Sequence, residues 1–148
     1  FFKSLANTNT FPVTSKEMTR FSLPPIEAIK MVFWVIRHSI GQEVVVPKTA
    51  SYRILDLVNA FSKKPKIKII GIRPGEKLHE ELISENDSLN TFELKNYYVI
   101  LTRNNKIINY YKKIFKAKLV SKNFSYKSNT NKKFLKSLDL RRIINRLP

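Results

Sequence analysis

The clearest pattern of hydrophobic and polar positions lies in residues 25–40. After two prolines, apolar side chains recur every three or four residues and stop before Gly41. Proline is tolerated in the first turn of a helix, and glycine often follows the last turn. This spacing predicts an amphipathic helix.

The rest of the chain alternates between strand and helix patterns. β-Branched and aromatic residues predict strands at residues 43–47, 66–72 and 96–101. Helical spacing predicts helices at 51–62, 76–84 and 137–147, the last with Ser137 as N-cap. Residues 103–136 show no clear pattern. The alternation over residues 25–72 predicts an α/β fold. The strands are too few for a doubly wound sheet, so we expect a missing partner half.

Charge divides the chain into two parts. Residues 1–102 carry 14 Lys and Arg against 10 Asp and Glu, whereas residues 103–148 carry 14 against the single Asp139. A basic tail can bind nucleic-acid phosphates, but we favour a drift in composition toward Lys and Asn. We therefore expect a domain over residues 1–102 and a basic extension over 103–148 that ends in a helix and packs on the same domain.

Composition narrows the class of protein. At 43% hydrophobic residues, the 148-residue chain can bury a core. It has no cysteine, which excludes disulfides and fits a reducing compartment. No apolar run approaches the roughly 18 residues of a membrane span, and no secretory signal precedes the first polar segment. We expect a cytoplasmic protein without a membrane partner.

The segment "GIRPGEKLHEELIS" (71–84) carries the first candidate site. Pro74 fixes φ and Gly75 permits a sharp turn, so Arg73 is presented at the end of a strand. Ligands of α/β proteins bind beyond such strand ends, and a guanidinium suits a phosphate. The alternative is a surface ion pair of Arg73 with Glu76 or Glu80.

A second candidate lies in "PVTSKEMTRF" (12–21), where Thr14, Thr19 and Arg20 offer two hydroxyls and a guanidinium. The segment could be an edge strand that faces a ligand or an ordinary capped turn. His79 has the features of a structural residue, and no metal-ligand spacing occurs among the carboxylates, so we expect no metal site.

Four segments carry a resemblance to a known family. They are the two candidate segments at residues 12–21 and 71–84, together with "EVVVPKTASYRILDLVNAF" (43–61) and "FSYKSNTNKKFL" (124–135), and it is their order and spacing along the chain that match. Together they resemble the C-terminal half of inverting UDP-N-acetylglucosamine 4,6-dehydratases, which belong to the extended short-chain dehydrogenase/reductase superfamily. The resemblance runs from residue 1 to about residue 100 and returns over 124–144. It implies the substrate-binding portion of an extended NAD(P)-binding Rossmann-type protein, with the Rossmann half missing.

The resemblance also implies a reaction. In the family, the sugar is oxidised transiently at C4, loses water across C5–C6 and regains hydride at C6 with inversion at C5. The 4-keto-6-deoxy product feeds pseudaminic acid or surface polysaccharides. NADP and a Tyr-x-x-x-Lys pair belong to the N-terminal half of the family. We find neither that pair nor a Gly-x-Gly-x-x-Gly motif here, so we expect a fragment inactive alone, with no catalytic or cofactor-binding residue.

The resemblance assigns the nucleotide-sugar site by matching positions. The substrate-binding residues are Pro12, Thr14, Met18, Thr19, Arg20, Arg73 and Glu76. Arg20 and Arg73 are expected to hold the diphosphate, and Thr14 and Thr19 the nucleotide. The family has Asp and Arg where this chain has Ser15 and Glu17, and we expect weaker binding for that reason.

The expected partners are a UDP-sugar, a missing or separately encoded Rossmann half and, in the full-length family, further copies of the protein. A split gene, a truncated record and a decayed remnant all fit the sequence. The alternative functions are a fragment of a related nucleotide-sugar epimerase and a basic nucleic-acid-binding module.

Overall fold

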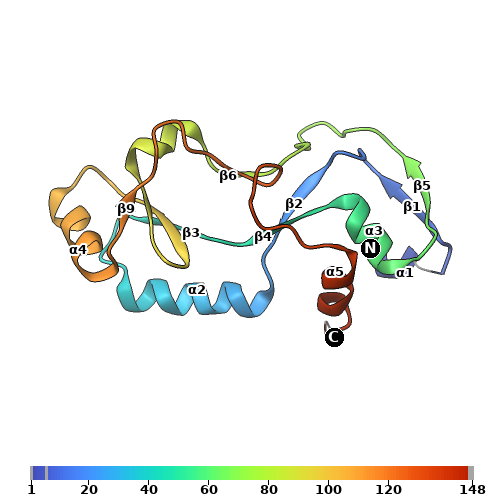
Figure 1. Cartoon of the computed structure of the whole chain (residues 1–148), viewed down its shortest axis with the longest axis horizontal. Coiled ribbons are helices and arrows are strands. Elements are labelled where there is room, and N and C mark those ends of the chain that lie inside the picture. Colours follow the sequence, from blue (N-terminus) through green and yellow to red (C-terminus); the bar gives the residue numbers. More distant parts are fainter. Residues whose placement is uncertain (1, 6, 147–148) are drawn as a thin grey trace. The chain divides into compact units, whose positions relative to one another are not determined.

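The computed structural model describes residues 2–5 and 7–146, which form two compact units (Figure 1). The first unit comprises Phe1–Ser22, Ala50–Glu80 and Ser128–Pro148, and the second comprises Leu23–Thr49 and Glu81–Lys127. The residues of each unit are therefore discontinuous in sequence. Residues 103–127 belong to the second unit and residues 128–148 to the first, so the basic region contributes to both.

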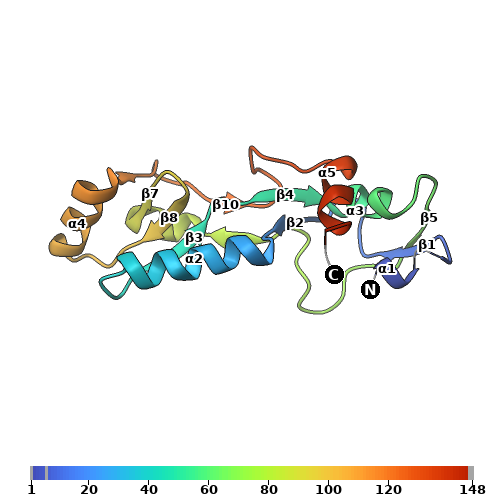
Figure 2. The same ribbon diagram turned by 90° about the horizontal axis from the view of Figure 1, so that it is seen from below.

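The first unit combines short sheets with helices. Its elements are α1 (Phe2–Leu5), β1 (Thr10–Val13), β2 (Thr19–Ser22), β4 (Ala50–Arg53), α3 (Ile54–Phe61), β5 (Lys66–Ile69) and α5 (Ser137–Ile144). Strand β1 pairs in parallel with β5, and β2 pairs antiparallel with β4 (Figure 2). The predicted α/β class is confirmed.

The core of the first unit lies between β1 and α3. Phe11, Val13 and Val58 are fully buried, and Phe2 and Phe61 pack against them. Helix α5 packs on α3, where the Arg141 guanidinium donates hydrogen bonds to the Asn59 and Ala60 carbonyls at 3.1 and 2.9 Å. A cation at these carbonyls stabilises the end of α3, whose last groups lack partners within the helix.

The second unit is built around a four-stranded sheet. Its elements are α2 (Pro25–His38), β3 (Val44–Pro47), β6 (Glu81–Ile83), the 3₁₀ helix η1 (Glu85–Asn90), β7 (Thr91–Glu93), β8 (Tyr97–Ile100), α4 (Asn105–Phe115), β9 (Lys118–Leu119) and β10 (Tyr126–Lys127). The strand order is β3-β8-β7-β9, with antiparallel pairs, and β10 pairs separately with β6.

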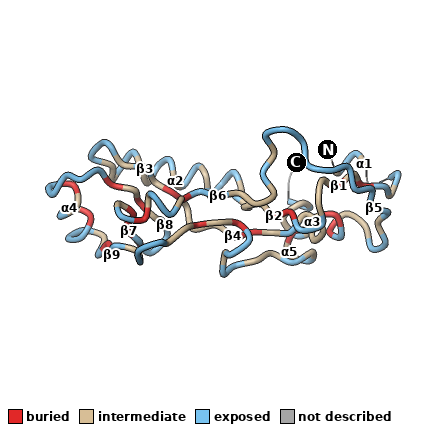
Figure 3. The backbone as a smooth tube through the Cα atoms, turned by 90° about the horizontal axis from the view of Figure 1, so that it is seen from above, coloured by how far each residue is buried: buried red, intermediate tan, exposed pale blue. Residues whose placement is uncertain are grey.

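Helix α4 covers the core of this second unit, whereas α2 stays largely exposed. Val99 and Tyr111 are fully buried, and Trp34 of α2 packs against their cluster. No residue of α2 itself is buried (Figure 3). The exposed fractions of Phe33 and Ile36 are 67% and 74%. The amphipathic helix predicted at residues 25–40 is confirmed, but its apolar stripe faces solvent in the described chain.

Of two other predicted helices, the one at residues 76–84 is absent and the one at residues 51–62 is shorter than predicted. Residues 76–84 do not form a helix: Leu78 and His79 run beside β2, and residues 81–83 form β6. Backbone pairing with other strands has prevailed over the local helix preference of the Glu- and Leu-rich sequence. The helix predicted at residues 51–62 begins only at Ile54, because the residues before it form β4.

The ends of the chain give two further corrections. Helix α5 begins at Ser137, so Lys136 is the N-cap. The Ser137 hydroxyl instead donates to Asp56 at 3.2 Å. Helix α4 lies in the region predicted to be without pattern, although Ile107, Tyr111 and Ile114 have helical spacing. Among the described residues, no helix is long and apolar enough to cross a membrane.

Candidate functional site

Strand β1 places one wall of the candidate site. Alternate residues of a strand point to opposite faces, and Phe11 and Val13 point into the core. Pro12 and Thr14 are half-buried and line a pocket in the first unit. The cavity volume is about 340 Å³.

The β2–β4 pair supplies a second wall. Arg20 lies opposite Tyr52 in the register of these strands, and both line the pocket. Thr19 and Ser51 occupy the alternate positions and are buried, with exposed fractions of 4% and 0%. The pair therefore presents a guanidinium and a phenol to the pocket and two hydroxyls to its other face.

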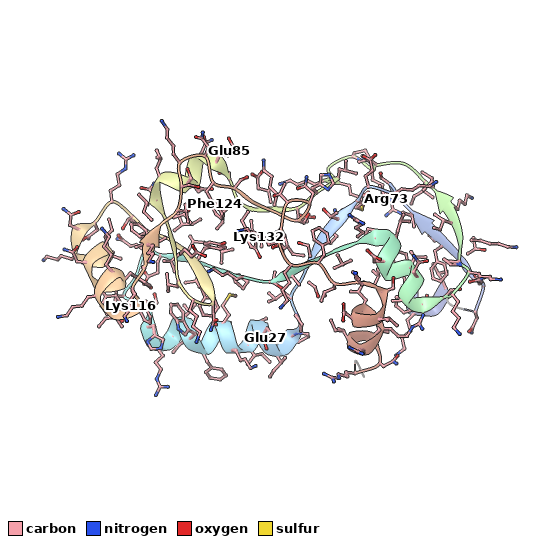
Figure 4. The ribbon with its side chains drawn as sticks, viewed as in Figure 1. Glu27, Arg73, Glu85, Lys116, Phe124 and Lys132 are labelled. Carbon is pink, nitrogen blue, oxygen red and sulfur yellow. The ribbon has the colours of Figure 1, made fainter. Side chains whose placement is uncertain are left out.

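Arg73 lies on the loop after β5 (Figure 4). It lines the pocket. The Glu76 N–H donates to the Arg73 carbonyl at 3.0 Å, and Gly75 has a φ of 78°. Proline followed by glycine with positive φ is typical of a type II turn. The predicted Pro74-Gly75 turn is confirmed, but the helix expected to follow it is absent.

The Arg20 guanidinium has several partners from the same unit. Nη1 donates to the Thr19 and Leu78 carbonyls at 2.8 and 3.2 Å. Nε lies 3.4 Å from Oε1 of Glu80, and Nη2 lies 3.6 Å from Oε1 of Glu76. The hydrogen bonds of Nη1 and the contact of Nε with Glu80 fix the plane of the guanidinium. The contact between Nη2 and Glu76, at 3.6 Å, is too long for a strong hydrogen bond, so Nη2 is able to donate to a ligand.

Glu76 connects the three segments of the site. Its carboxylate accepts from the Thr14 hydroxyl at 3.2 and 3.3 Å and from the Arg73 backbone N–H at 3.3 Å. Within residues 2–5 and 7–146, the exposed Arg73 guanidinium forms no ion pair. The ion pairs that the sequence suggested for Arg73 are made by Arg20 instead.

The structure brings most predicted site residues together. Pro12, Thr14, Met18, Arg20, Arg73 and Glu76 all line the pocket. Thr19 does not: its hydroxyl lies 2.9 Å from Nδ1 of His79 and 2.7 Å from the Ser128 hydroxyl. The alternation along β2 explains this, since Thr19 and Arg20 must face opposite sides.

Sequence reasoning missed Tyr52, which also lines the pocket. Burial raises the pKa of the Tyr52 hydroxyl, and the nearby positive charge of Arg20 opposes this shift. The phenol is therefore a neutral hydrogen-bonding group near pH 7. Local pattern does not indicate its position, because the spacing predicts a helix over residues 51–62, whereas residues 51–53 belong to β4.

The described residues do not fit a dinucleotide cofactor. A phosphate-binding turn of the Rossmann type needs glycines between a strand and the helix after it. Gly41 follows a helix, and Gly71 and Gly75 lie between two strands. In the described part of the chain, these glycines therefore do not form a dinucleotide-binding turn.

Comparison with known proteins places the chain in a family. The family described as "Polysaccharide biosynthesis protein" matches residues 1–102. The chain belongs to this polysaccharide biosynthesis family. The predicted resemblance is thereby confirmed at the level of the family, and the match includes every residue of the pocket.

Two relatives show how far the similarity extends. UDP-N-acetylglucosamine 4,6-dehydratase (inverting) of Campylobacter jejuni serotype O:2 is 37% identical over 154 residues, covering 98% of this chain and 46% of the relative. UDP-glucose 4-epimerase of Rickettsia canadensis is 30% identical over 104 residues, covering 68% of this chain and 30% of the relative. The chain thus spans about half the length of the dehydratase and less of the epimerase.

A solved structure shares the fold. Pen from Bacillus thuringiensis superposes with a TM-score of 0.77 at 25% identity, covering 97% of this chain and 44% of that protein. The superposition extends beyond the family match at residue 102 to nearly the whole chain. The basic region of this family member therefore belongs to the shared fold.

Proposed function

We propose that the pocket of the first unit binds the diphosphate of a UDP-sugar. The observation that carries this proposal is that Arg20 and Arg73 line one pocket and that the exposed Arg73 guanidinium forms no ion pair among the described residues. Guanidinium groups bind phosphate oxygens in pairs of charge-assisted hydrogen bonds. The pocket volume lies within the usual range of small-molecule sites, roughly 300–1,000 Å³.

The pocket walls have separate roles in this proposal. Arg73 and Nη2 of Arg20 contact the phosphates, while Glu76 holds Thr14, Arg20 and the Arg73 turn in place. Pro12 and Met18 supply apolar contact surface, and Tyr52 offers a neutral hydroxyl. Glu76 and Glu80 both lie near Arg20, so the cation available to a diphosphate is the exposed Arg73 guanidinium, which forms no ion pair among the described residues.

The names of the relatives support a UDP-sugar more firmly than they support one reaction. Both the Campylobacter and the Rickettsia enzymes are named for a UDP-sugar. The higher identity and coverage of the dehydratase lead us to propose a role in removing water from UDP-N-acetylglucosamine, for pseudaminic acid or another surface polysaccharide. A part of a UDP-sugar epimerase is the second candidate, supported by the Rickettsia relative.

We propose further that this chain binds the substrate and that the rest of the catalytic machinery lies in the part of the relatives that it does not cover. The purified chain, supplied with NADP and UDP-N-acetylglucosamine, is then expected to form no keto-sugar by mass spectrometry. Turnover by the chain alone would show that its own residues carry the reaction. Activity in a mixture with a relative's remaining half would identify the reaction.

Calorimetric titration with UDP and UMP tests the binding proposal. We expect tighter binding of UDP than of UMP, and about a tenfold loss of UDP affinity in Arg73→Gln, as for one lost charge-assisted contact. Arg103→Gln is the matched control, because Arg103 is an exposed arginine outside the pocket. Equal losses in both variants, or no binding by the unaltered chain, would contradict the proposal.

A further inference from the structure

The face of the β2–β4 pair opposite the pocket carries two buried hydroxyl groups. Thr19 and Ser51 lie on this face, and neither is more than 4% exposed. Buried hydroxyls require hydrogen-bond partners, because an unsatisfied polar group destabilises the folded state. His79 is one partner of Thr19, and both hydroxyls also have a partner in a segment distant in sequence, residues 128–135.

This segment attaches to β4 through both backbone and side chains. The Ser51 N–H donates to the Lys133 carbonyl, and the Leu135 N–H donates to the Ser51 carbonyl, each at 2.8 Å. The Asn131 side-chain amide donates to the Ser51 hydroxyl at 2.9 Å. Residues 131–135 thus act as an additional, irregular strand on the strand that carries Tyr52.

Ser128 attaches to the Arg20 side of the site. Its hydroxyl lies 2.7 Å from the Thr19 hydroxyl and accepts from the Glu80 N–H at 2.9 Å. Its own N–H donates to the Glu80 carbonyl at 2.8 Å. Ser128 is therefore bonded to the strand residue before Arg20 and to the residue whose carboxylate lies 3.4 Å from Nε of Arg20.

We infer that Ser128 is a positioning residue of the anion site. It fixes the Arg20 guanidinium by holding Thr19 and Glu80 at a constant separation, and it contacts no part of the pocket itself. This role rests on the proposed function, since a diphosphate is the ligand that Arg20 is held to meet. Ser128 lies outside residues 1–102, so the family match does not include it.

A serine suits this role because one hydroxyl can donate once and accept twice. It can bond Thr19 and the Glu80 N–H together within a fully buried space. Alanine would leave the Glu80 N–H without its acceptor, and among the described residues the Thr19 hydroxyl would retain only His79. The expected result is a less fixed Arg20 rather than an altered pocket wall.

Proton exchange of the Arg20 Nε–H, measured by ¹⁵N NMR, tests this inference without a ligand. The exchange rate in Ser128→Ala is expected to rise about tenfold, as for the loss of one buried hydrogen bond. The backbone N–H of Val58, in the core of the same unit, reports general loosening, and its rate is expected to change much less. Ser121→Ala is the matched control, since Ser121 is exposed.

Affinity provides the second readout. In Ser128→Ala, the ratio of the UMP to the UDP dissociation constant is expected to fall by about tenfold. A smaller folded fraction would lower the binding stoichiometry but leave this ratio unchanged. If Ser128→Ala does not fold, Ser128→Cys keeps the approximate size with weaker hydrogen bonds and is expected to shift both readouts in the same direction.

The outcomes separate the two proposals. Faster Arg20 exchange with a reduced ratio supports the positioning role. Unchanged exchange and ratio, with only a lower melting temperature, would overturn it. If the unaltered chain binds neither nucleotide, the proposed function fails, and the Arg20 exchange rate alone decides whether Ser128 positions this side chain.

Discussion

Nη2 of Arg20 lies 3.6 Å from Oε1 of Glu76, within a pocket that we propose binds a diphosphate. The carboxylate orients the cation, but it also repels a phosphate. Glu76→Gln removes the charge and keeps an acceptor for the Thr14 hydroxyl. Because two charges at 4 Å in water interact by about 1 kcal/mol, we expect UDP affinity to increase by up to about fivefold.

Calorimetry with UDP measures this change, and Glu85→Gln, at an exposed carboxylate outside the pocket, is the control. Weaker binding by Glu76→Gln than by the control would show that orientation of Arg20 outweighs repulsion.

The turn that presents Arg73 depends on Gly75. Its φ of 78° lies in the left-handed region, and a Cβ there would meet no atom within 4 Å. Gly75→Ala therefore introduces backbone strain without a clash and is expected to lower the free energy of unfolding by about 1 kcal/mol. Asparagine tolerates positive φ better, so Gly75→Asn is expected to lose less. Urea unfolding compares the two variants, and equal stabilities would contradict the assigned turn.

Arg141 and Arg142 provide a matched pair on α5. Arg141→Ala removes both hydrogen bonds to the last carbonyls of α3, so we expect the free energy of unfolding to fall by about 1–2 kcal/mol. The Arg142 side chain is 77% exposed, and its ion pair with Asp139 spans 3.9 Å. Arg142→Ala is expected to cost less than about 0.5 kcal/mol. A similar loss in both variants would show that α5 is not fixed to α3 by Arg141.

The second unit has opposite pH dependences at Tyr111 and Glu43. The Tyr111 hydroxyl donates to the Glu43 carboxylate at 2.8 Å. Burial, followed by the bond to Glu43, raises the pKa of Tyr111. Burial acts to raise the pKa of Glu43, but hydrogen bonds from Ile40, Tyr111 and Ser39 lower it overall. The contribution of Tyr111 to stability is thus lost as pH rises above the ordinary tyrosine pKa, and that of Glu43 as pH falls through its ordinary value.

Tyr111→Phe removes the phenol and one of the bonds that lower the Glu43 pKa. Compared with the unaltered chain, its free energy of unfolding is expected to change less between about pH 9 and pH 11 and less between about pH 5 and pH 3. Urea unfolding across these ranges measures both slopes. Identical slopes in the two proteins would contradict this account.

Helix α2 exposes an apolar stripe, and we expect it to promote self-association. The exposed fractions of Ile29, Phe33 and Ile36 are 50%, 67% and 74%, and their spacing places them on one face. Large exposed apolar patches promote association. The double variant Phe33→Ser and Ile36→Ser is expected to shift sedimentation toward monomer with little loss of unfolding free energy. Lys30→Ser, on the same helix, is the control, and unchanged association would show that another surface is responsible.

The sequence predicted the elements whose own residues determine them. Helix α2 and strands β3, β5 and β8 follow from local spacing and β-branched runs, and the Arg73 turn follows from proline and glycine chemistry. The predictions for residues 76–84 failed because their conformation depends on pairing with β2 and β10. Local preference contains no information about such distant partners.

The same distinction holds for the candidate site. The Arg20 and Arg73 segments were found from sequence, and the structure brings both to one pocket. Tyr52 was missed because its face depends on the β2–β4 register, which the sequence does not show. Thr19 faces away from the pocket because residues alternate along β2, and the sequence alone leaves open whether residues 12–21 form a strand or a turn. The hydrogen bond between Ser128 and Thr19 joins residues 109 positions apart, so local sequence pattern could not predict it.

The central claim is that UDP binds between the Arg20 and Arg73 segments. A titration of the ¹⁵N-labelled chain with UDP, followed through backbone amide shifts, tests it most directly. We predict the largest saturable shifts at Thr14, Arg20, Arg73, Gly75 and Glu76, and their loss in Arg73→Gln. Shifts spread over the lysines of residues 103–127 and abolished by moderate salt would instead indicate non-specific phosphate binding and would contradict the claim.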